Sequence, residues 1–149
     1  MSQNPLHILL ADDDDDDRLS FKDAFEELKV KTVVTMVNDG VELMDFLHKP
    51  GIDLPHIVFL DLNMPRKSGM QCLKEIRSNN KLKDLSIAIY STSGLEKDIE
   101  ETFVKGANIY IKKPNDFELL KTMLAKVINI NWQYHTSGLN KENFILNVQ

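Results

Sequence analysis

The chain has 149 residues, of which 42% are apolar and 28% charged, a composition typical of one globular domain and unlike that of disordered chains. No run approaches the roughly 18 apolar residues of a membrane span, and the N-terminus lacks the basic start and long apolar stretch of a secretory signal. Six of the 23 acidic residues are consecutive, Asp12 to Asp17, and they account for the net charge of −5, so no strongly basic nucleic-acid-binding surface is expected. The single cysteine, Cys72, excludes an internal disulfide and a cysteine-based zinc site, and indicates a reducing cytoplasm.

Short apolar runs alternate along the chain with amphipathic stretches of helical length. The first expected strand, residues 6–11, precedes a helix over 16–29, and the second strand, 32–37, precedes a helix over 40–49. The third strand is expected at 56–60, followed by a helix over 70–77. After the fourth strand, 87–90, and the fifth, 108–111, the last two helices are expected to begin at capping patterns, Ser93 with Glu96 and Asn115 with Glu118.

This alternation of five strands with five helices predicts an α/β fold, with a parallel sheet covered by helices on both faces. In such sheets the ligand lies beyond the carboxyl ends of the strands. The residues that follow each strand are therefore the ones to examine for function.

Three carboxylates, a hydroxyl and an ammonium are expected to meet at that edge. They belong to Asp12 and Asp13 after the first strand, Asp61 after the third, Ser91 after the fourth and Lys113 after the fifth. Alternation of side chains along the strand turns the neighbouring Lys112 to the other face. Thr92 is a weaker candidate than Ser91 for the hydroxyl.

These residue types together predict phosphoryl chemistry next to a metal ion. Clustered carboxylates repel one another unless a cation is present, and Mg²⁺ is a hard cation that prefers oxygen ligands. The ammonium and the hydroxyl suit an oxyanion close to that metal, such as a phosphoryl group. A carboxylate can itself accept a phosphoryl group, and Asp61, after the central strand, is the candidate acceptor.

Four segments carry a family resemblance: ILLADD, VFLDLNMPRKSG, IAIYSTS and GANIYIKKP. In this order they resemble the receiver domain of two-component response regulators, over roughly residues 6–130. The resemblance implies a doubly wound, flavodoxin-like three-layer sandwich with strand order 2-1-3-4-5. We expect residues 1–130 to form the receiver domain and residues 131–149 a C-terminal extension without an output domain, as in stand-alone receivers that are paired with phytochrome kinases.

The resemblance also implies a role for each metal-site residue. Asp61 corresponds to the phosphoacceptor, Asp13 to a direct metal ligand, and Asp12 to a ligand that acts through water. Asn63 corresponds to the residue whose backbone carbonyl completes the metal site. The run of six aspartates exceeds the usual acidic pair; residues 14–17 are expected to be helix-capping charges, and whether Asp14 contributes to the metal site stays open.

The remaining roles concern the response to phosphorylation. Lys113 corresponds to the lysine that pairs with the phosphoryl group, and a cis peptide bond between Lys113 and Pro114 is implied. Ser91 corresponds to the hydroxyl that moves toward the phosphoryl group, in a position where threonine is commoner. Tyr110 corresponds to the aromatic residue that changes rotamer together with Ser91.

The expected function is that of a bacterial, cytoplasmic signalling protein that takes a phosphoryl group from a histidine kinase or a histidine phosphotransfer protein. It would catalyse only its own phosphorylation and dephosphorylation, and would signal to a downstream protein through the face formed by helix 4, strand 5 and helix 5. No nucleic acid or membrane is expected as a partner, and a homodimer is left open.

Two alternatives compete with this interpretation. A phosphatase of the haloacid dehalogenase type also uses an aspartate after a strand, but it needs a second aspartate two residues later as general acid, where this chain has Asn63. A degenerate receiver that acts only as a docking module would have lost the acceptor or the lysine. Asp61 and Lys113 are both present.

Overall fold

The computed structural model describes residues 5–129, in which five strands and five helices alternate close to the expected bounds. The elements are β1 Leu6–Ala11, α1 Asp15–Leu28, β2 Thr32–Val37, α2 Gly40–Leu47, β3 Ile57–Leu60, α3 Gly69–Ser78, β4 Ser86–Ser91, α4 Glu96–Val104, β5 Ile109–Lys112 and α5 Phe117–Ile128. The expected extension, residues 131–149, lies outside the described residues. None of the helices between residues 5 and 129 has the length and apolar character needed to cross a membrane.

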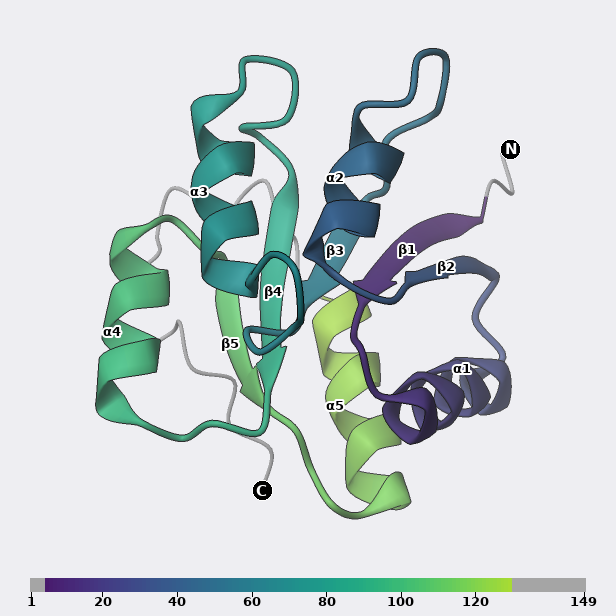
Figure 1. Ribbon diagram of the computed structural model, residues 1–149. Coiled ribbons are helices and arrows are strands. Elements are labelled where there is room, and N and C mark those ends of the chain that lie inside the picture. The colour runs from purple at the N-terminus through teal and green to yellow at the C-terminus, as the bar shows by residue number, and fades with distance from the viewer. Residues whose placement is uncertain (1–4, 130–149) are drawn as a thin grey trace.

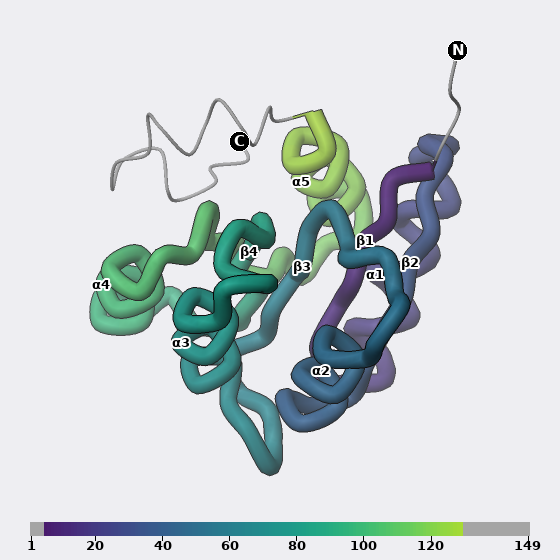
Figure 2. The backbone as a smooth tube through the Cα atoms, turned by 90° about the horizontal axis from the view of Figure 1, so that it is seen from above, coloured from purple at the N-terminus to yellow at the C-terminus, as the bar shows by residue number. Residues whose placement is uncertain are grey.

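The five strands form one parallel sheet in the order β2-β1-β3-β4-β5, which confirms the predicted flavodoxin-like fold. Helices α1 and α5 cover one face of the sheet, while α2, α3 and α4 cover the other (Figures 1 and 2). Because all strands run the same way, their carboxyl ends meet at one edge, the lower edge in Figure 1.

The central strands are buried on both faces because alternate side chains enter two separate cores. In β1, Leu9 packs toward α2 and α3, whereas Leu10 packs toward α1 and α5, and neither is exposed to solvent. In the core under α1 and α5, the ring of Phe21 lies 4.9 Å from that of Phe59 and 5.7 Å from that of Tyr90, edge to face. This two-sided burial explains why these strands are short apolar runs.

Two helix starts differ from the predicted capping patterns. The N-cap of α4 is Leu95, which offers no side-chain cap. Ser93 lies two residues too early to cap the helix, so its hydroxyl accepts a hydrogen bond from the N–H of Leu95 and donates one of 2.5 Å to Asp98. The N-cap of α5 is Asp116 rather than Asn115, because the chain enters the helix one residue later than expected.

The half-buried side chain of Arg77 joins α3 to the amino ends of β4 and β5 through its guanidinium. It donates hydrogen bonds of 2.7 Å to the carbonyls of Lys83 and Leu85, just before β4. It also donates to the carbonyl of Gly106 and to the side chain of Asn108, both at 2.9 Å, just before β5. These bonds join the elements at the sheet edge opposite the one where the predicted site lies.

Candidate functional site

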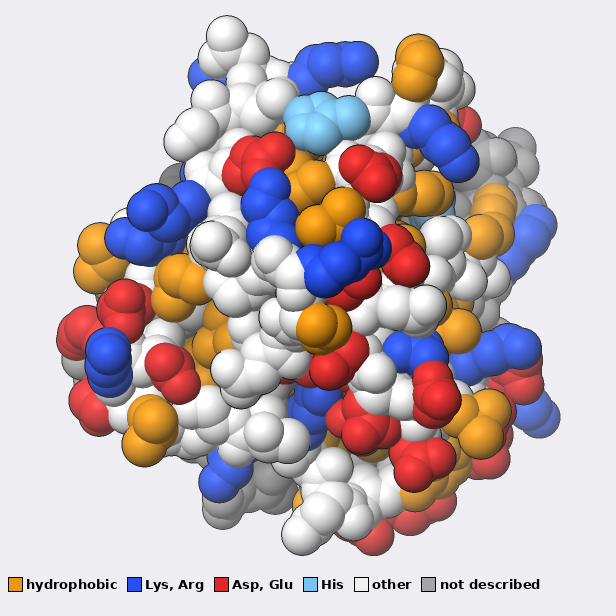
Figure 3. All heavy atoms as spheres, viewed as in Figure 1, with side chains coloured by type: hydrophobic (Ala, Val, Ile, Leu, Met, Phe, Trp, Pro, Cys, Tyr) orange, Lys and Arg blue, Asp and Glu red, His pale blue; other side chains and the backbone are white. Residues whose placement is uncertain are grey.

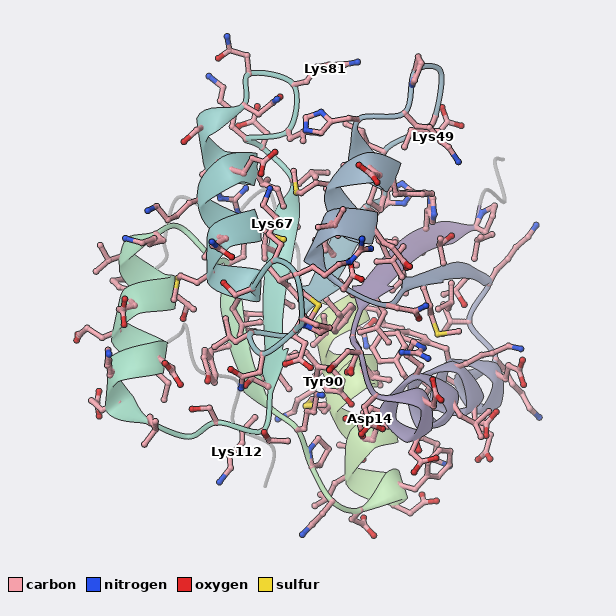
Figure 4. The ribbon with its side chains drawn as sticks, in the orientation of Figure 1. Asp14, Lys49, Lys67, Lys81, Tyr90 and Lys112 are labelled. Carbon is pink, nitrogen blue, oxygen red and sulfur yellow. The ribbon has the colours of Figure 1, made fainter. Side chains whose placement is uncertain are left out.

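The predicted site residues come together at the carboxyl edge of the sheet. Asp12 and Asp13 directly follow β1, Asp61 follows β3, and Ser91 is the last residue of β4. Figure 4 marks this edge by the labels of Tyr90 and Asp14, which lie where the ends of the central strands meet α1.

An acidic triad forms the centre of the site. Asp12, Asp13 and Asp61 each offer a carboxylate oxygen, and these oxygens lie within 4.8 Å of one another. Asp12 is completely buried and Asp61 nearly so, while Asp13 is exposed. The triad therefore presents one solvent-facing carboxylate and two that are held by the fold.

Lys113 directly follows β5, and its ammonium enters this group of carboxylates. Its Nζ lies 2.8 Å from Oδ2 of Asp12 and 3.2 Å from Oδ2 of Asp61, and the side chain is only 8% exposed. The neighbouring Lys112 is exposed and points away from the site (Figure 4), as strand alternation predicted.

Burial sets the electrostatics of the site. It raises the pKa of Asp12 to about 6, although the Lys113 ammonium acts in the opposite direction. It also raises the pKa of Asp61, again against Lys113. For Lys113 itself burial favours the neutral amine, but the carboxylates of Asp12 and Asp17 outweigh that effect and raise its pKa.

The loop after β3 holds Asp61 through its backbone. The N–H of Asn63 donates a 3.2 Å hydrogen bond to Oδ1 of Asp61. The N–H of Gly69 donates to the carbonyl of Leu62 at 2.9 Å, and a Cβ at this glycine would lie 2.1 Å from the carbonyl oxygen of Asp61. Only glycine permits this close approach of two backbone segments.

Ser91 and Tyr110 both bond to the backbone of Ser93, through its N–H and its carbonyl, which belong to two successive peptide groups. Ser91 is completely buried, and its hydroxyl accepts a 3.1 Å hydrogen bond from the N–H of Ser93. The hydroxyl of Tyr110, itself buried, donates a 2.7 Å hydrogen bond to the carbonyl of Ser93. Thr92 is exposed, which favours Ser91 over Thr92 as the hydroxyl of the site.

The peptide bond between Lys113 and Pro114 is trans, so the cis bond implied by the resemblance is not found. The trans isomer is the lower in energy for most bonds that precede proline, by about 0.5–1 kcal/mol. In this conformation the N–H of Lys113 donates a 2.7 Å hydrogen bond to the carbonyl of Ser91, which joins the end of β5 to the end of β4.

The acidic run serves more than one purpose. Asp14 is the N-cap of α1, and its side chain accepts a hydrogen bond from the N–H of Asp17, as expected for a capping charge. Asp17, which was also expected to be a capping charge, instead places Oδ2 2.8 Å from Nζ of Lys113. Sequence reasoning missed this contact. In Figure 3 acidic side chains gather over the lower right of the surface, where α1 begins.

The donor set of the triad fits a hard divalent cation. Three carboxylates converge, and Oδ2 of Asp12 is fully buried without a hydrogen bond of normal geometry, although Lys113 Nζ lies 2.8 Å from it. A buried charged oxygen in that state gains from a cation. The triad can therefore bind a divalent ion through oxygen ligands.

Comparisons with known proteins identify the family to which the chain is similar. The family model described as "Response regulator receiver domain" matches residues 8–125. The chain is 29% identical over 129 residues to the probable methanogenesis regulatory protein FilR2 of Methanothrix harundinacea, covering 85% of this chain and 83% of that protein. It is 28% identical over 130 residues to response regulator Rcp1 of Synechocystis, covering 85% of this chain and 88% of Rcp1.

Solved structures similar to this chain are also response regulators. The Mn²⁺-bound form of Rcp1 superposes with a TM-score of 0.77 at 26% identity, covering 84% of this chain and 96% of that one. The phosphorylated cyanobacterial phytochrome response regulator RcpA superposes with a TM-score of 0.77 at 30% identity, covering 87% and 95%.

Proposed function

The chain belongs to the response regulator receiver domain family, and from that premise we propose that it accepts a phosphoryl group on Asp61. The observation that carries the proposal is the contact between a buried carboxylate and a buried ammonium. Oδ2 of Asp61 lies 3.2 Å from Nζ of Lys113, at the edge where Asp12 and Asp13 complete an acidic triad.

The proposed reaction is an in-line displacement at phosphorus. A carboxylate oxygen of Asp61 forms a bond to the phosphorus of a phosphohistidine, while the bond between phosphorus and the histidine nitrogen breaks and its electron pair stays on the ring. The N–H of Asn63 holds the other oxygen of Asp61 in place. Lys113 then donates to the phosphoryl oxygens and compensates part of their charge.

We propose Mg²⁺ as the cation of the triad, held by Asp12, Asp13 and Asp61 together with the backbone carbonyl of Asn63. When bound, the ion would neutralise charge on the phosphoryl oxygens. The fit of the donor set supports this assignment, as does the Mn²⁺-bound form of Rcp1 among the similar structures.

The phosphoryl donor would be a histidine kinase or a histidine phosphotransfer protein. We propose that the chain works as a stand-alone regulator that catalyses only its own phosphorylation and dephosphorylation. The Ser91 hydroxyl would turn toward the phosphoryl group, and the change would reach the face of α4, β5 and α5 through Tyr110. A downstream protein would recognise that face, so phosphorylation acts as a shift between two states.

Chemical phosphorylation tests the proposal. Incubation with acetyl phosphate and Mg²⁺, followed by intact-mass measurement, should show one added phosphoryl group that hydroxylamine removes, as expected for an acyl phosphate. Asp61→Asn should remove the adduct. Asp84→Asn, at an exposed aspartate before β4, should label like the parent. Equal labelling of the Asp61→Asn variant would refute the assignment of the acceptor.

A further inference from the structure

Asp17 binds Lys113 from outside the acidic triad. Its Oδ2 lies 2.8 Å from Nζ of Lys113 with hydrogen-bond geometry. The contact of the same ammonium with Asp61 is longer, at 3.2 Å. The contact with Oδ2 of Asp12, at 2.8 Å, lacks normal hydrogen-bond geometry. An ammonium has three protons to donate, and the shortest of its true hydrogen bonds goes to Asp17.

Among residues 5–129, the carboxylate of Asp17 makes no capping hydrogen bond at the start of α1. Asp17 is the third residue of the helix, where in a capping box the side chain would accept from the N–H of the N-cap residue; α3 has such a box. In α1 the N–H of the N-cap residue, Asp14, donates instead to Oδ1 of Asp12, at 2.9 Å. The carboxylate of Asp17 is therefore not used in a capping box, and it accepts instead from Lys113, directly after β5.

Asp17 is also the most exposed of the three carboxylates around the ammonium. Its side chain is 38% exposed, against 0% for Asp12 and 7% for Asp61. It lines a surface cavity of about 320 Å³ between α1 and the start of α5, together with Tyr90 and Pro114. Water can therefore solvate Asp17 when Lys113 turns away, whereas a buried carboxylate would lose its cation at a much larger cost.

We propose that Asp17 is a positioning residue that competes with the phosphoryl group for the ammonium of Lys113, and so weakens the hold of the site on that group. The inference rests on the proposed function, because Lys113 must donate to the phosphoryl oxygens once Asp61 is modified. Asp17 is not part of the triad, so a cation bound there does not occupy the carboxylate of Asp17, which can still accept from Lys113. It also adds a further carboxylate whose charge repels the phosphoryl oxygens.

The test compares Asp17→Asn with Asp16→Asn. Both substitutions remove one negative charge from the first turn of α1, but Asp16 is exposed and is not among the ion-pair partners of Lys113. Beryllofluoride, a mimic of the phosphoryl group, is titrated into each protein at saturating Mg²⁺ and followed by amide NMR. We expect Asp17→Asn to bind it about two- to fivefold more tightly than the parent, the range of a partly exposed ion pair, and Asp16→Asn to match the parent.

Two further measurements separate competition from a structural effect. The side-chain carbon resonances of Lys113, identified by their loss in Lys113→Arg, should shift in Asp17→Asn but not in Asp16→Asn, without any ligand. Asp17→Glu, which keeps the charge, should bring beryllofluoride affinity back toward that of the parent.

The inference is wrong if Asp17→Asn binds beryllofluoride no more tightly than the parent, or if Asp16→Asn tightens binding equally. A parent protein that bound no beryllofluoride, and behaved like Asp61→Asn, would instead contradict the proposed function itself. The two failures are therefore distinguishable.

Discussion

The hydroxyl of Tyr110 donates a 2.7 Å hydrogen bond to the backbone carbonyl of Ser93. The N–H of the same Ser93 donates to the hydroxyl of Ser91, so the two residues proposed to respond to phosphorylation are attached to the backbone of one residue, through successive peptide groups. Movement of the Ser91 hydroxyl toward a phosphoryl group removes its bond to that N–H. The backbone of Ser93 would then be less restrained on its N–H side, next to the carbonyl that accepts from Tyr110.

Ser91→Ala should therefore still be phosphorylated while losing the linked change. The hydroxyl is proposed to respond to the phosphoryl group rather than to attack, so intact-mass labelling should persist. The amide shifts that beryllofluoride induces in α4 and β5 should be strongly reduced. Thr92→Ala, at an exposed position beside it, serves as the control and should behave like the parent. An identical shift pattern in Ser91→Ala and the parent would eliminate the hydroxyl from the switch.

Lys113→Ala should bind beryllofluoride far more weakly than the parent, because the phosphoryl mimic loses the cation that is positioned to meet it. Lys113→Arg should restore binding only in part, since the planar guanidinium has a different reach from a compact ammonium. The matched control is Lys112→Ala, whose side chain lies on the other face. Beryllofluoride affinity measured by amide NMR is the readout, and equal losses at both lysines would contradict the site.

Binding of Mg²⁺ should be weak, because the ion keeps several waters and gains few protein ligands. Asp13→Ala should weaken it most, as measured by titration of amide shifts. Asp14→Ala should leave the Mg²⁺ affinity nearly unchanged but destabilise the protein by about 1 kcal/mol in urea unfolding, because it removes the N-cap of α1. A larger loss of Mg²⁺ affinity at Asp14 would mean that the wrong carboxylate has been assigned as the ligand.

Asp39 lies outside the site, and its lowered pKa should make the free energy of unfolding depend on pH. The backbone N–H of Glu42 and the guanidinium of Arg66 hold the pKa of Asp39 below its ordinary value. The unfolded chain therefore binds a proton at a higher pH than the folded one. The stabilisation is fully present above the unfolded pKa, about 4, and is lost as the pH falls below it toward the folded value.

The measurement is urea unfolding of the parent and of Asp39→Asn at a series of pH values. The parent should be the more stable at pH 7, because Asn can cap α2 but cannot pair with Arg66 as an anion. The difference should shrink below pH 4. A difference that stayed constant down to pH 3 would show that the charge of Asp39 does not contribute.

Much of the fold follows from patterns that are local in sequence. The apolar runs locate the strands because both faces of the sheet are buried, and Leu9 and Leu10 illustrate how neighbouring residues serve opposite cores. The strand order was available only through the family resemblance. Helix starts were harder to predict, because Asn115 and Asp116 are adjacent residues of similar capping tendency and only the path of the chain selects between them.

The site residues that directly follow a strand, or end one, could be predicted from the sequence. The positions of Asp12, Asp13, Asp61, Ser91 and Lys113 follow from parallel strands that share one edge. The contact of Asp17 with Lys113 joins residues 96 positions apart and depends on how α1 packs beside α5. Within the four aspartates of residues 14–17, no local signal in the sequence distinguishes Asp17 as the one whose carboxylate pairs with Lys113.

The bonds of Arg77 have a consequence for how amide hydrogens should exchange with solvent. They fasten α3 to the approaches of β4 and β5 at the edge remote from Lys113. Opening of that edge would break several bonds to a charged donor at once, so exchange there should be slow and insensitive to beryllofluoride. Amides near Ser93 should respond instead, so the remote edge supplies an internal reference within the same molecule. The amino edge of the sheet would then keep its structure on phosphorylation, and the conformational change would be confined to the carboxyl edge.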